Sequence, residues 1–270
     1  MSAPEFPHTQ PLPDELARPL AAAASRLGPL ARQIMWYSEL SSTNDLAAAL
    51  AERGVREGCV IIADTQTAGR GRHGRSWCSP PGAGLYVSVV MRPPVRAVPL
   101  LTVGAGVAIA EGIRAATGLT PSLKWPNDVY VGARKLAGIL AEAGSIPGGA
   151  QHVVLGFGIN VLPAAYPREI AERATSLEGE LGRSVDRGAV LVECLAALAA
   201  RYDDLQRGHS AIVLDAWRAL ARPMLGRPVE WDSRGGIERG IADDIDDSGA
   251  LVVRTAAGRE RIISGELRWI

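Results

Sequence analysis

Cysteine is scarce in this sequence of 270 residues. Its three cysteines, Cys59, Cys78 and Cys194, are odd in number and far apart. This spacing argues against a disulfide framework and lacks the close pairs that bind zinc. Cys78 lies near a basic loop, yet a lone cysteine is more often a small buried hydrophobe than a reactive group. The pattern favours a reducing compartment, and we expect a cytoplasmic protein.

An excess of charge of either sign is also lacking, because Lys+Arg and Asp+Glu number 29 each. A protein devoted to nucleic acid usually carries a basic excess, so any positive site here is local. No uninterrupted apolar run approaches the ~20 residues of a membrane span, and the N-terminus lacks the basic and apolar regions of a secretory signal. We therefore expect partners that are neither DNA nor a membrane.

The chain is long enough for a main domain and a small one, and its 47% apolar residues allow a real core. Residues 1–30 are predicted to form a leader, disordered over the proline-rich start and helical over 13–26. Residues 31–222 are predicted to form the main domain. From residue 223 to 270 the pattern changes to short strands separated by turns, which is typical of a small β-barrel.

Within the main domain, apolar and β-branched runs predict strands, and longer periodic segments predict helices. Glycines 104, 106 and 112, in the helix predicted over 99–117, are expected to allow close packing against a sheet. A glycine-rich loop is expected over 144–149 and a turn at 235–236. The predicted strands cover 34–38, 60–63, 85–91, 129–131, 136–142, 153–161, 228–231, 238–245, 250–254 and 259–263, and the predicted helices cover 46–52, 99–117, 186–206 and 211–220.

Residues 69–77 concentrate positive charge and backbone freedom, reading Gly-Arg-Gly-Arg-His-Gly-Arg-Ser-Trp. Glycine lets the backbone approach a ligand closely, and arginine offers a planar fork of donors to carboxylate and phosphate oxygens. No Gly-Lys-Ser/Thr follows, so the segment is not a Walker A loop. From composition alone, an anion-binding loop and an ordinary solvated basic loop both remain open.

Three further segments carry residue types suited to a site. Polar residues 41–45 precede a helix, where they can cap it and also leave its free N–H groups facing a ligand. Lys124 stands before Trp-Pro at a strand end and is either a surface cation or a functional one. Gly156 and Gly158 interrupt an apolar strand, which indicates either a bulge or something that approaches that face closely.

Together these segments suit the binding of a polyanion and the stabilisation of developing negative charge, as in phosphoryl or nucleotidyl transfer. The histidines do not form a plausible Ser-His-Asp set, and no metal-ligand cluster is visible. The residues by themselves lead no further than this class of chemistry.

The motifs resemble those of the biotin–protein ligases. Residues 69–77 match that family's Gly-Arg-Gly-Arg-x-Gly-Arg-x-Trp loop, and 124–128 match its Lys-Trp-Pro-Asn-Asp. Residues 134–140 read as its Arg-Lys-Leu-Ala-Gly-Ile-Leu, 42–44 as its Ser-Thr-Asn, and 156–160 as its Gly-x-Gly-Ile-Asn. The resemblance implies an α+β fold, with a mixed β-sheet packed with helices as in class II synthetases, and a small C-terminal SH3-like β-barrel. Family members that are also repressors carry an N-terminal winged helix, which residues 1–30 are too short to form, so we expect a monofunctional ligase.

Carried over to this sequence, the resemblance implies three sets of site residues. The catalytic set is Lys135, Arg70, Arg72 and Lys124. The biotin-binding set is Ser42, Thr43, Asn44, Gln66, Gly69, Arg70, Gly71, Arg72, Lys135, Gly138, Gly156 and Gly158. The ATP-binding set is Arg72, Arg75, Trp77, Lys124, Asn127, Lys135 and Asn160, with Trp77 near adenine.

The implied reaction joins biotin and ATP into biotinyl-5′-AMP and then biotinylates a lysine in the carrier domain of a biotin-dependent carboxylase, such as acetyl-CoA carboxylase. Mg²⁺ would accompany ATP; no resident metal site is expected, and Asp128 is at most a weak candidate ligand. The resemblance leaves the acceptor, and the choice between monomer and homodimer, open. Three rival functions are a lipoate or octanoate ligase, a nucleic-acid-binding module and a biotin-binding accessory protein without chemistry.

Overall fold

A seven-stranded mixed sheet forms the centre of the larger part of the computed structural model, which describes residues 7–145, 151–163, 166, 168–233, 236–263, 265 and 267–270. The strand order is β1-β2-β3-β7-β6-β5-β4. β1 and β2 are parallel, and the other neighbours are antiparallel. These strands are β1 (Gln33–Leu40), β2 (Cys59–Gln66), β3 (Gly84–Met91), β4 (Ser122–Lys124), β5 (Asp128–Val131), β6 (Arg134–Ser145) and β7 (Gln151–Asn160).

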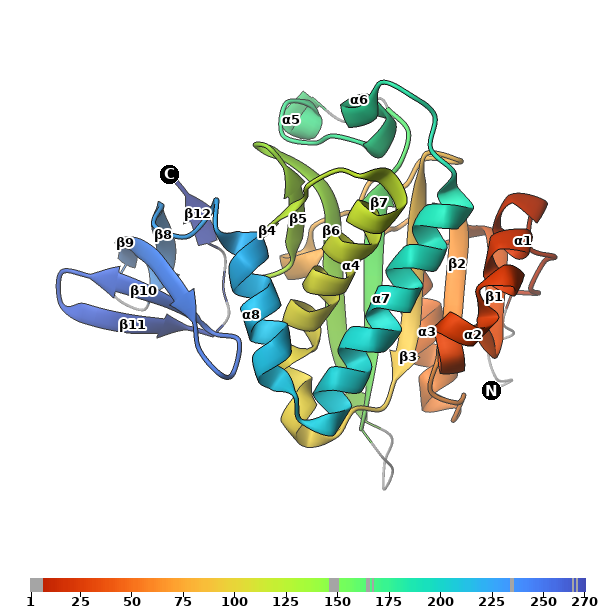
Figure 1. Ribbon diagram of the computed structural model, residues 1–270, viewed down its shortest axis with the longest axis horizontal. Helices are drawn as coiled ribbons and strands as arrows, with labels where there is room; N and C mark the ends of the chain where they lie inside the picture. Colours follow the sequence, from red (N-terminus) through yellow and green to blue (C-terminus); the bar gives the residue numbers. More distant parts are fainter. Residues whose placement is uncertain are drawn as a thin grey trace.

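Helices cover both faces of this sheet (Figure 1). α4 (Leu101–Thr117), α7 (Arg187–Arg207) and α8 (Ser210–Ala221) lie on one side, and α3 (Thr43–Glu52) packs on the other against β2, β3 and β7. The two sides have separate apolar cores. The shorter helices are α1 (Asp14–Ala22), α2 (Ala24–Leu27), α5 (Arg168–Ala171) and α6 (Leu177–Leu181).

The alternation of side chains along β7 decides which residues face the site. Leu155, Phe157 and Ile159 belong to the core under α4. Val154 belongs to the core under α3. Because neighbouring side chains in a strand point to opposite faces, Gly156 and Gly158 lie on the α3 side of the sheet.

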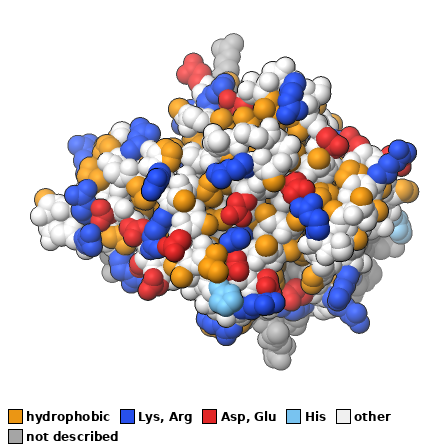
Figure 2. Space-filling model, viewed as in Figure 1, with side chains coloured by type: hydrophobic (Ala, Val, Ile, Leu, Met, Phe, Trp, Pro, Cys, Tyr) orange, Lys and Arg blue, Asp and Glu red, His pale blue; other side chains and the backbone are white. Residues whose placement is uncertain are grey.

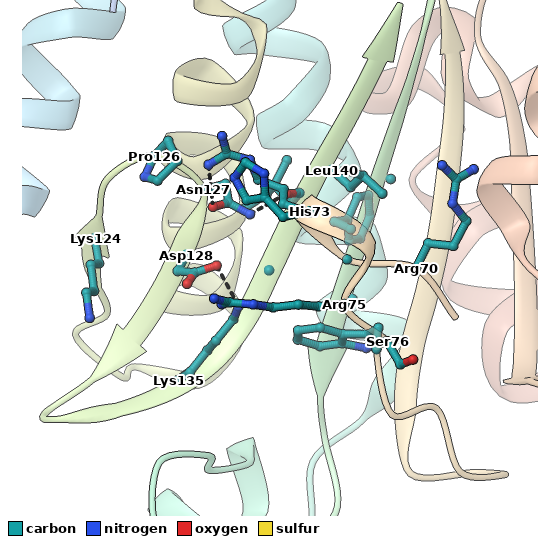
Figure 3. Close-up of a pocket in the computed structure, with 18 of the residues that line it drawn as sticks. Arg70, His73, Arg75, Ser76, Lys124, Pro126, Asn127, Asp128, Lys135 and Leu140 are labelled. Carbon is teal, nitrogen blue, oxygen red and sulfur yellow. Dashed lines mark hydrogen bonds and ion pairs between the residues drawn. The ribbon is translucent and has the colours of Figure 1, made fainter. Parts of the chain in front are cut away.

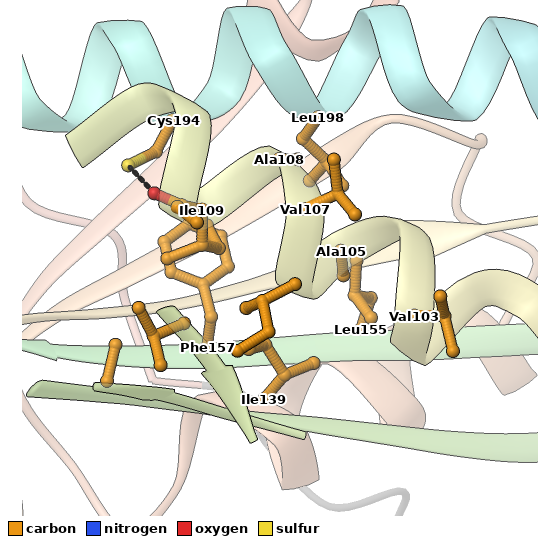
Figure 4. Packing of buried hydrophobic residues seen from close by; sticks show 14 of the residues in the cluster. Val103, Ala105, Val107, Ala108, Ile109, Ile139, Leu155, Phe157, Cys194 and Leu198 are labelled. Atoms are coloured by element: carbon orange, nitrogen blue, oxygen red, sulfur yellow. Dashed lines mark hydrogen bonds between the residues drawn. The ribbon is translucent and has the colours of Figure 1, made fainter. Parts of the chain in front are cut away.

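Helix α4 is mostly buried, and its glycines pack differently from the prediction. A Cβ built on Gly112 would lie 2.5 Å from the Cα of Cys194 in α7. Gly104 likewise faces Leu205 of α7 at 3.1 Å, and only Gly106 faces a strand residue, Leu123. Two of the three glycines therefore permit contact between helices, not between helix and sheet, and Figure 4 shows Cys194 of α7 beside Ile109 of α4.

The same apolar stretch bears on the prediction that no segment is suited to a membrane. Among the described residues, Val95–Thr117 is long and apolar enough to cross one, with a mean hydropathy of 1.4. Of the most apolar 18-residue window in this segment, 72% is buried inside the protein, as expected of a core helix.

The segment before β1 lies against the main sheet. The backbone N–H of Gln10 donates to the carbonyl of Trp36 at 3.0 Å, and the Gln10 side chain accepts from the Ser38 N–H at 2.9 Å. Leu16 and Leu20 of α1 are buried in the core with α7. The disordered start was predicted over 1–12; residues 1–6 lie outside the described residues, and Gln10 is paired with Trp36 instead. Of the predicted loop 144–149, residues 146–149 lie outside the described residues, and Gly144 belongs to β6. Of the predicted turn, 235 lies outside them and Gly236 begins β9.

A second, antiparallel sheet follows α8, in the order β11-β10-β9-β8-β12. Four of its strands correspond to the predicted ones. The fifth, β12, has only three residues at the chain end and was not predicted, because such a short run has no periodicity to recognise. The strands are β8 (Pro228–Ser233), β9 (Gly236–Ile245), β10 (Leu251–Thr255), β11 (Gly258–Ile262) and β12 (Leu267–Trp269).

The turn between β9 and β10 holds this second sheet to the larger part. The buried indole Nε1 of Trp125 donates to the carbonyl of Gly249 at 2.9 Å. A Cβ on Gly249, whose φ is +79°, would come within 3.2 Å of Leu100 and Val103. Arg218 of α8 adds an ion pair to Asp244 at 2.8 Å. Trp125, the residue that follows Lys124, therefore joins the two sheets directly.

Candidate functional site

A cavity of about 820 Å³ lies where the loop 69–77, the polar start of α3, strands β4 to β7 and the C-terminal strand β12 meet. Every residue of the three predicted site sets lines this cavity except Gly69. The additional lining residues include His73, Ser76, Tyr130, Asp128, Tyr166, Arg173, Arg268 and Trp269.

Glycines of the sheet form the floor of the cavity. Gly138 of β6 lies opposite Gly158 of β7, and Gly156 follows on the same face. The pairing of β7 with both neighbours runs without a register shift, so these glycines do not mark a bulge. A Cβ on Gly156 would lie 2.0 Å from Asn44 Oδ1. Of the two readings left open by the sequence, close approach is therefore the correct one.

Trp77 covers the rest of this floor. A Cβ on Gly158 would lie 2.5 Å from the indole Nε1, and one on Gly138 would lie 2.9 Å from the indole ring. The indole Nε1 is buried and has no hydrogen-bond partner among the described residues. The flat ring thus lies directly on backbone, as only glycine allows.

The loop that carries Trp77 is closed by its own backbone. The Trp77 N–H donates to the Gly69 carbonyl at 2.8 Å, and the Gly71 N–H donates to the Arg75 carbonyl at 2.7 Å. A Cβ on Gly69 would lie 2.5 Å from the Trp77 carbonyl oxygen. Gly69 therefore serves the closure of the loop, which explains why it does not face the cavity.

A buried polar network stands at one side of the floor. Ser42 caps α3 by accepting from the Asp45 N–H at 3.4 Å, which confirms the predicted cap. The Thr43 N–H donates to Gln66 Oε1 at 2.8 Å. Ser88 Oγ, which is fully buried, lies 2.8 Å from Thr43 Oγ1 and donates to Asn44 Oδ1 at 2.6 Å. These side chains are held in fixed positions, as a site for polar recognition needs.

Arg70 is turned away from the lysines of the cavity (Figure 3). Its guanidinium pairs with Asp45 of α3 at 2.5 Å and with Glu142 of β6. Glu142 also accepts from Asn44 Nδ2 at 2.8 Å. In this arrangement the first arginine of the loop ties the loop base to α3 and β6, while the later arginines extend over the cavity.

Arg72 crosses to the segment that follows Trp125. Its guanidinium lies 3.4 Å from Asn127 Oδ1, and Asn127 Nδ2 donates to the Ile139 carbonyl at 2.7 Å. Burial lowers the pKa of Arg72, an effect that the nearby Asp128 opposes. A guanidinium stays protonated under these conditions, so Arg72 contributes a partly desolvated positive charge.

The two cavity lysines have different surroundings. Lys135 Nζ pairs with Asp128 at 2.6 Å and stands 5.3 Å from the centre of the Trp77 ring (Figure 3). Lys124 Nζ stands 5.1 Å from the centre of the Tyr130 ring and 5.7 Å from that of Trp269. Burial lowers the pKa of Lys124. Lys124 is therefore half-buried in the site, and not the surface cation that the sequence left possible.

Asn160 lies at the end of β7, where it is buried. Its amide donates to the Thr175 carbonyl at 2.9 Å. This contact holds the segment before α6 beside the cavity. Asn160 thus lines the cavity and at the same time supports its wall.

Sequence reasoning missed Ser88, Tyr130 and Trp269. Ser88 is an unremarkable polar residue inside an apolar strand, and Trp269 lies on the strand that was not predicted. For the two lysines, however, the sequence did contain a signal that pointed to the site. Only two of the 29 basic residues are lysines, Lys124 and Lys135, and both line the cavity.

Charge of neither sign is in excess on one face of the molecule. On the face seen in Figure 2, basic and acidic side chains are interspersed over both sheets and the helices. Across the described ranges, no group of three or more His, Cys, Asp or Glu side chains is placed to hold a metal ion. Asp128, the weak candidate for Mg²⁺, is paired with Lys135.

Comparison with known proteins agrees with this geometry. A model of the biotin/lipoate A/B protein ligase family matches residues 36–160, and one of the biotin protein ligase C terminal domain matches 224–267. The biotin–[acetyl-CoA-carboxylase] ligase of Mycobacterium tuberculosis is 37% identical over 241 residues, 86% of this chain and 87% of the relative. The bifunctional ligase/repressor BirA of Bacillus subtilis is 35% identical over 243 residues, 88% of this chain and 74% of the relative.

A solved structure extends the likeness to three dimensions. The biotin protein ligase from Aquifex aeolicus in complex with biotin and ATP is 30% identical, with a TM-score of 0.76, and the match covers 88% of this chain and 100% of that one. The fold is that of biotin protein ligases, with a mixed sheet packed with helices followed by a small antiparallel sheet. The chain belongs to the biotin protein ligase family. The predicted family and fold class are confirmed, while the domain boundaries and the residue roles stay predictions.

Proposed function

We propose that this chain is an ATP-dependent biotin–protein ligase, in which biotinyl-5′-AMP forms first and biotin then passes to a lysine of a carboxylase carrier domain. One observation carries the proposal. Around a single cavity, a glycine floor and a fixed polar network adjoin an arginine loop and the only two lysines of the chain. A flat polar ring system fits the glycine floor and its polar network, and a chain of phosphates fits the arginine loop and the lysines.

The floor would receive the fused rings of biotin. With no side chain on Gly138, Gly156 or Gly158, a ring system can approach the backbone as closely as the Trp77 indole does now. Ser42, Thr43, Asn44 and Gln66 stand at the edge of this floor and offer donors and acceptors for a ureido group. Gly71 would let the loop backbone approach the same ligand.

In the first step, a carboxylate oxygen of biotin attacks the α-phosphorus of ATP. The bond from the α-phosphorus to the oxygen that bridges to the β-phosphate breaks, and pyrophosphate leaves. Both reactants are anions, so their approach needs positive charge already in place. Arg72, Arg75, Lys124 and Lys135 supply it, and Mg²⁺ enters as part of the nucleotide substrate.

Trp77, Asn127 and Asn160 complete the proposed nucleotide site. Trp77 belongs to the loop, so one movement of the loop would bring its ring to the adenine and Arg72 towards the acyl phosphate. Arg70 would reach the same phosphate only by leaving Asp45 and Glu142. Closing the loop would also keep water from the reactive anhydride.

In the second step, a lysine amine of the carrier domain attacks the acyl carbon of biotinyl-5′-AMP. An amide bond forms, the bond from the acyl carbon to the phosphate oxygen breaks, AMP leaves, and the amine loses a proton. The acceptor we propose is the carrier domain of acetyl-CoA carboxylase or a related acyl-CoA carboxylase. Free thiols at all three cysteines fit the cytoplasm, where we place the enzyme. We expect it to act without DNA or a membrane, as a monomer or homodimer.

The test is exchange of labelled pyrophosphate into ATP. Exchange that requires biotin, and that lipoate does not support, is the expected result. A second assay completes the test by measuring transfer of labelled biotin to a carrier domain. Transfer should occur to the intact domain and not to the same domain with its acceptor lysine replaced by arginine. Exchange without biotin, or with lipoate in its place, would assign the chain to another acyl substrate. Binding of biotin without any exchange would make it an accessory protein.

A further inference from the structure

Lys124 is held by two aromatic rings that come from different parts of the chain. Its ammonium lies 5.1 Å from the centre of the Tyr130 ring on β5 and 5.7 Å from the centre of the Trp269 ring on β12. Both distances are within the range in which the negative face of a ring attracts a cation. All three residues line the cavity.

The comparison with Lys135 shows what this arrangement achieves. Lys135 is neutralised by the Asp128 carboxylate at 2.6 Å. Among the described residues, no carboxylate lies within ion-pair distance of Lys124. Aromatic rings fix an ammonium without cancelling its charge, because a ring carries no net charge. Lys124 therefore has two ring contacts in place of a direct ion pair, which leaves its ammonium available to an anion in the cavity.

Trp269 occupies its position through the C-terminal sheet. It pairs with Val229 of β8, and the N–H of the next residue, Ile270, donates to the Pro228 carbonyl at 3.1 Å. The indole Nε1 of Trp269 is buried and has no partner among the described residues. The position of the ring is thus set by the strand and by ring contacts, and not by a hydrogen bond of its own N–H.

We propose that Trp269 is a positioning residue for adenylation, which holds the Lys124 ammonium over the cavity together with Tyr130 and so makes the phosphate site depend on the C-terminal sheet. This inference rests on the proposed function, because it assigns a role in the ATP-consuming step. It gives the second sheet a part in that step beyond packing on the first.

The charges around Lys124 set the direction of the expected titration. Burial lowers the pKa of Lys124, Asp128 raises it, and the cations Lys135, Arg227 and Arg173 lower it further. A ring contact favours the charged ammonium. Removing the Trp269 ring while Lys124 stays buried should therefore lower the pKa of Lys124 further.

The scarcity of lysine makes this titration directly measurable. Reductive methylation of the full chain with ¹³C-formaldehyde places labelled methyl groups only on Lys124, Lys135 and the N-terminal amine. Carbon and proton chemical shifts of these methyls, followed against pH, report each amine, and the variant Lys135→Arg assigns them. The N-terminal amine is recognised by its titration at about pH 7.7.

Two substitutions separate the ring from its volume. Trp269→Phe keeps an aromatic face, whereas Trp269→Leu keeps only an apolar side chain. We expect the leucine variant to move the Lys124 methyl signal and to lower its titration midpoint. The Lys124 signal of Trp269→Phe should stay close to that of the wild type. The Lys135 signal should be unchanged in both variants. A Lys124 signal that is the same in Trp269→Leu as in wild type would overturn the proposal. Tyr130→Leu repeats the test from the other ring if the leucine variant at 269 does not fold.

A double-mutant cycle carries the test to the reaction. The affinity for a non-hydrolysable ATP analogue, measured with biotin bound, should fall about five- to tenfold in Trp269→Leu. In a Lys124→Met background, the same change should have no further effect. Equal effects in both backgrounds would show that Trp269 acts independently of Lys124 and would refute the proposal. Absence of biotin-dependent exchange in the wild type would instead refute the proposed function.

Discussion

The indole of Trp77 lies so close to Gly158 that a Cβ on this glycine would stand 2.5 Å from the indole Nε1. Gly158→Ala should therefore push the ring off the floor or place a methyl group where biotin would lie. Because an inserted methyl in a packed site costs about 1–3 kcal/mol, we expect the KM for biotin to rise about tenfold or more. Pyrophosphate exchange at varied biotin concentration measures it.

Gly106→Ala provides the matched control for this substitution. Gly106 is on α4, on the opposite side of the sheet, and its Cβ would lie 3.5 Å from Leu123, an ordinary contact. Alanine favours a helix over glycine by about 1 kcal/mol, so this variant should gain stability and keep its KM for biotin. An unchanged KM in Gly158→Ala would contradict the assignment of the glycine floor.

Arg70 connects the loop base to two carboxylates, on Asp45 and Glu142. All three side chains are at least a third exposed, so the pairs add little global stability. Arg70→Gln should therefore unfold at nearly the same urea concentration as the wild type but expose residues 71–77. Trypsin should then cleave after Arg72 or Arg75 several times faster.

Adding biotin with a non-hydrolysable ATP analogue should slow this cleavage in the wild type. Arg254→Gln serves as control, because Arg254 forms a similar exposed pair with Asp243, at 2.9 Å, on the second sheet. The idea that Arg70 holds the loop fails if the two variants are cleaved alike.

Arg72 stands in the middle of the loop and reaches Asn127 across the cavity. Replacement by glycine removes this contact and one positive charge above the proposed anhydride. We expect Arg72→Gly still to form biotinyl-5′-AMP but to release it into solution. Chromatography of the filtrate after a single turnover measures the released fraction, and retention equal to that of the wild type would disprove the expectation.

The hydrogen bond from Trp125 to Gly249 joins the two sheets. Trp125→Phe keeps an aromatic ring but leaves the buried Gly249 carbonyl without its donor, and an unpaired buried polar group costs about 1–3 kcal/mol. We expect a loss of stability of that size in urea unfolding. We also expect the β9–β10 turn to exchange its amide hydrogens faster. Equal exchange in the variant would show that the bond does not hold the sheets together.

His152 should give the protein a stability that depends on pH below neutrality. It is buried, and burial together with Arg92 lowers its pKa below 6.5. The unfolded chain then binds a proton at a higher pH than the folded one, so the free energy of unfolding decreases as the pH falls below about 6.5. Unfolding in urea between pH 7 and pH 5 measures the slope. His152→Gln should reduce it, and an identical slope would exclude this histidine as the cause.

The local sequence pattern was sufficient to predict most helices and strands that carry the site residues. The N-cap at Ser42, the buried strand before residue 69 and the helix that begins after Asp186 follow from short-range physics, in which a few neighbouring residues decide the backbone. The direction in which the Arg70 side chain points did not follow from short-range physics. Its partners Asp45 and Glu142 are 25 and 72 residues away in sequence, and no local pattern places them beside it.

The amino-acid sequence by itself determined the motifs, their order and the two lysines, and hence the family and its chemistry, because these are properties of residue types and spacing. Only the tertiary structure decided that Gly138 and Gly158 lie under Trp77, since that requires strand register and the path of the loop together. It also decided that Trp269, 145 residues from Lys124 and on a strand too short to predict, meets that lysine. Contacts of this kind depend on how distant segments pack.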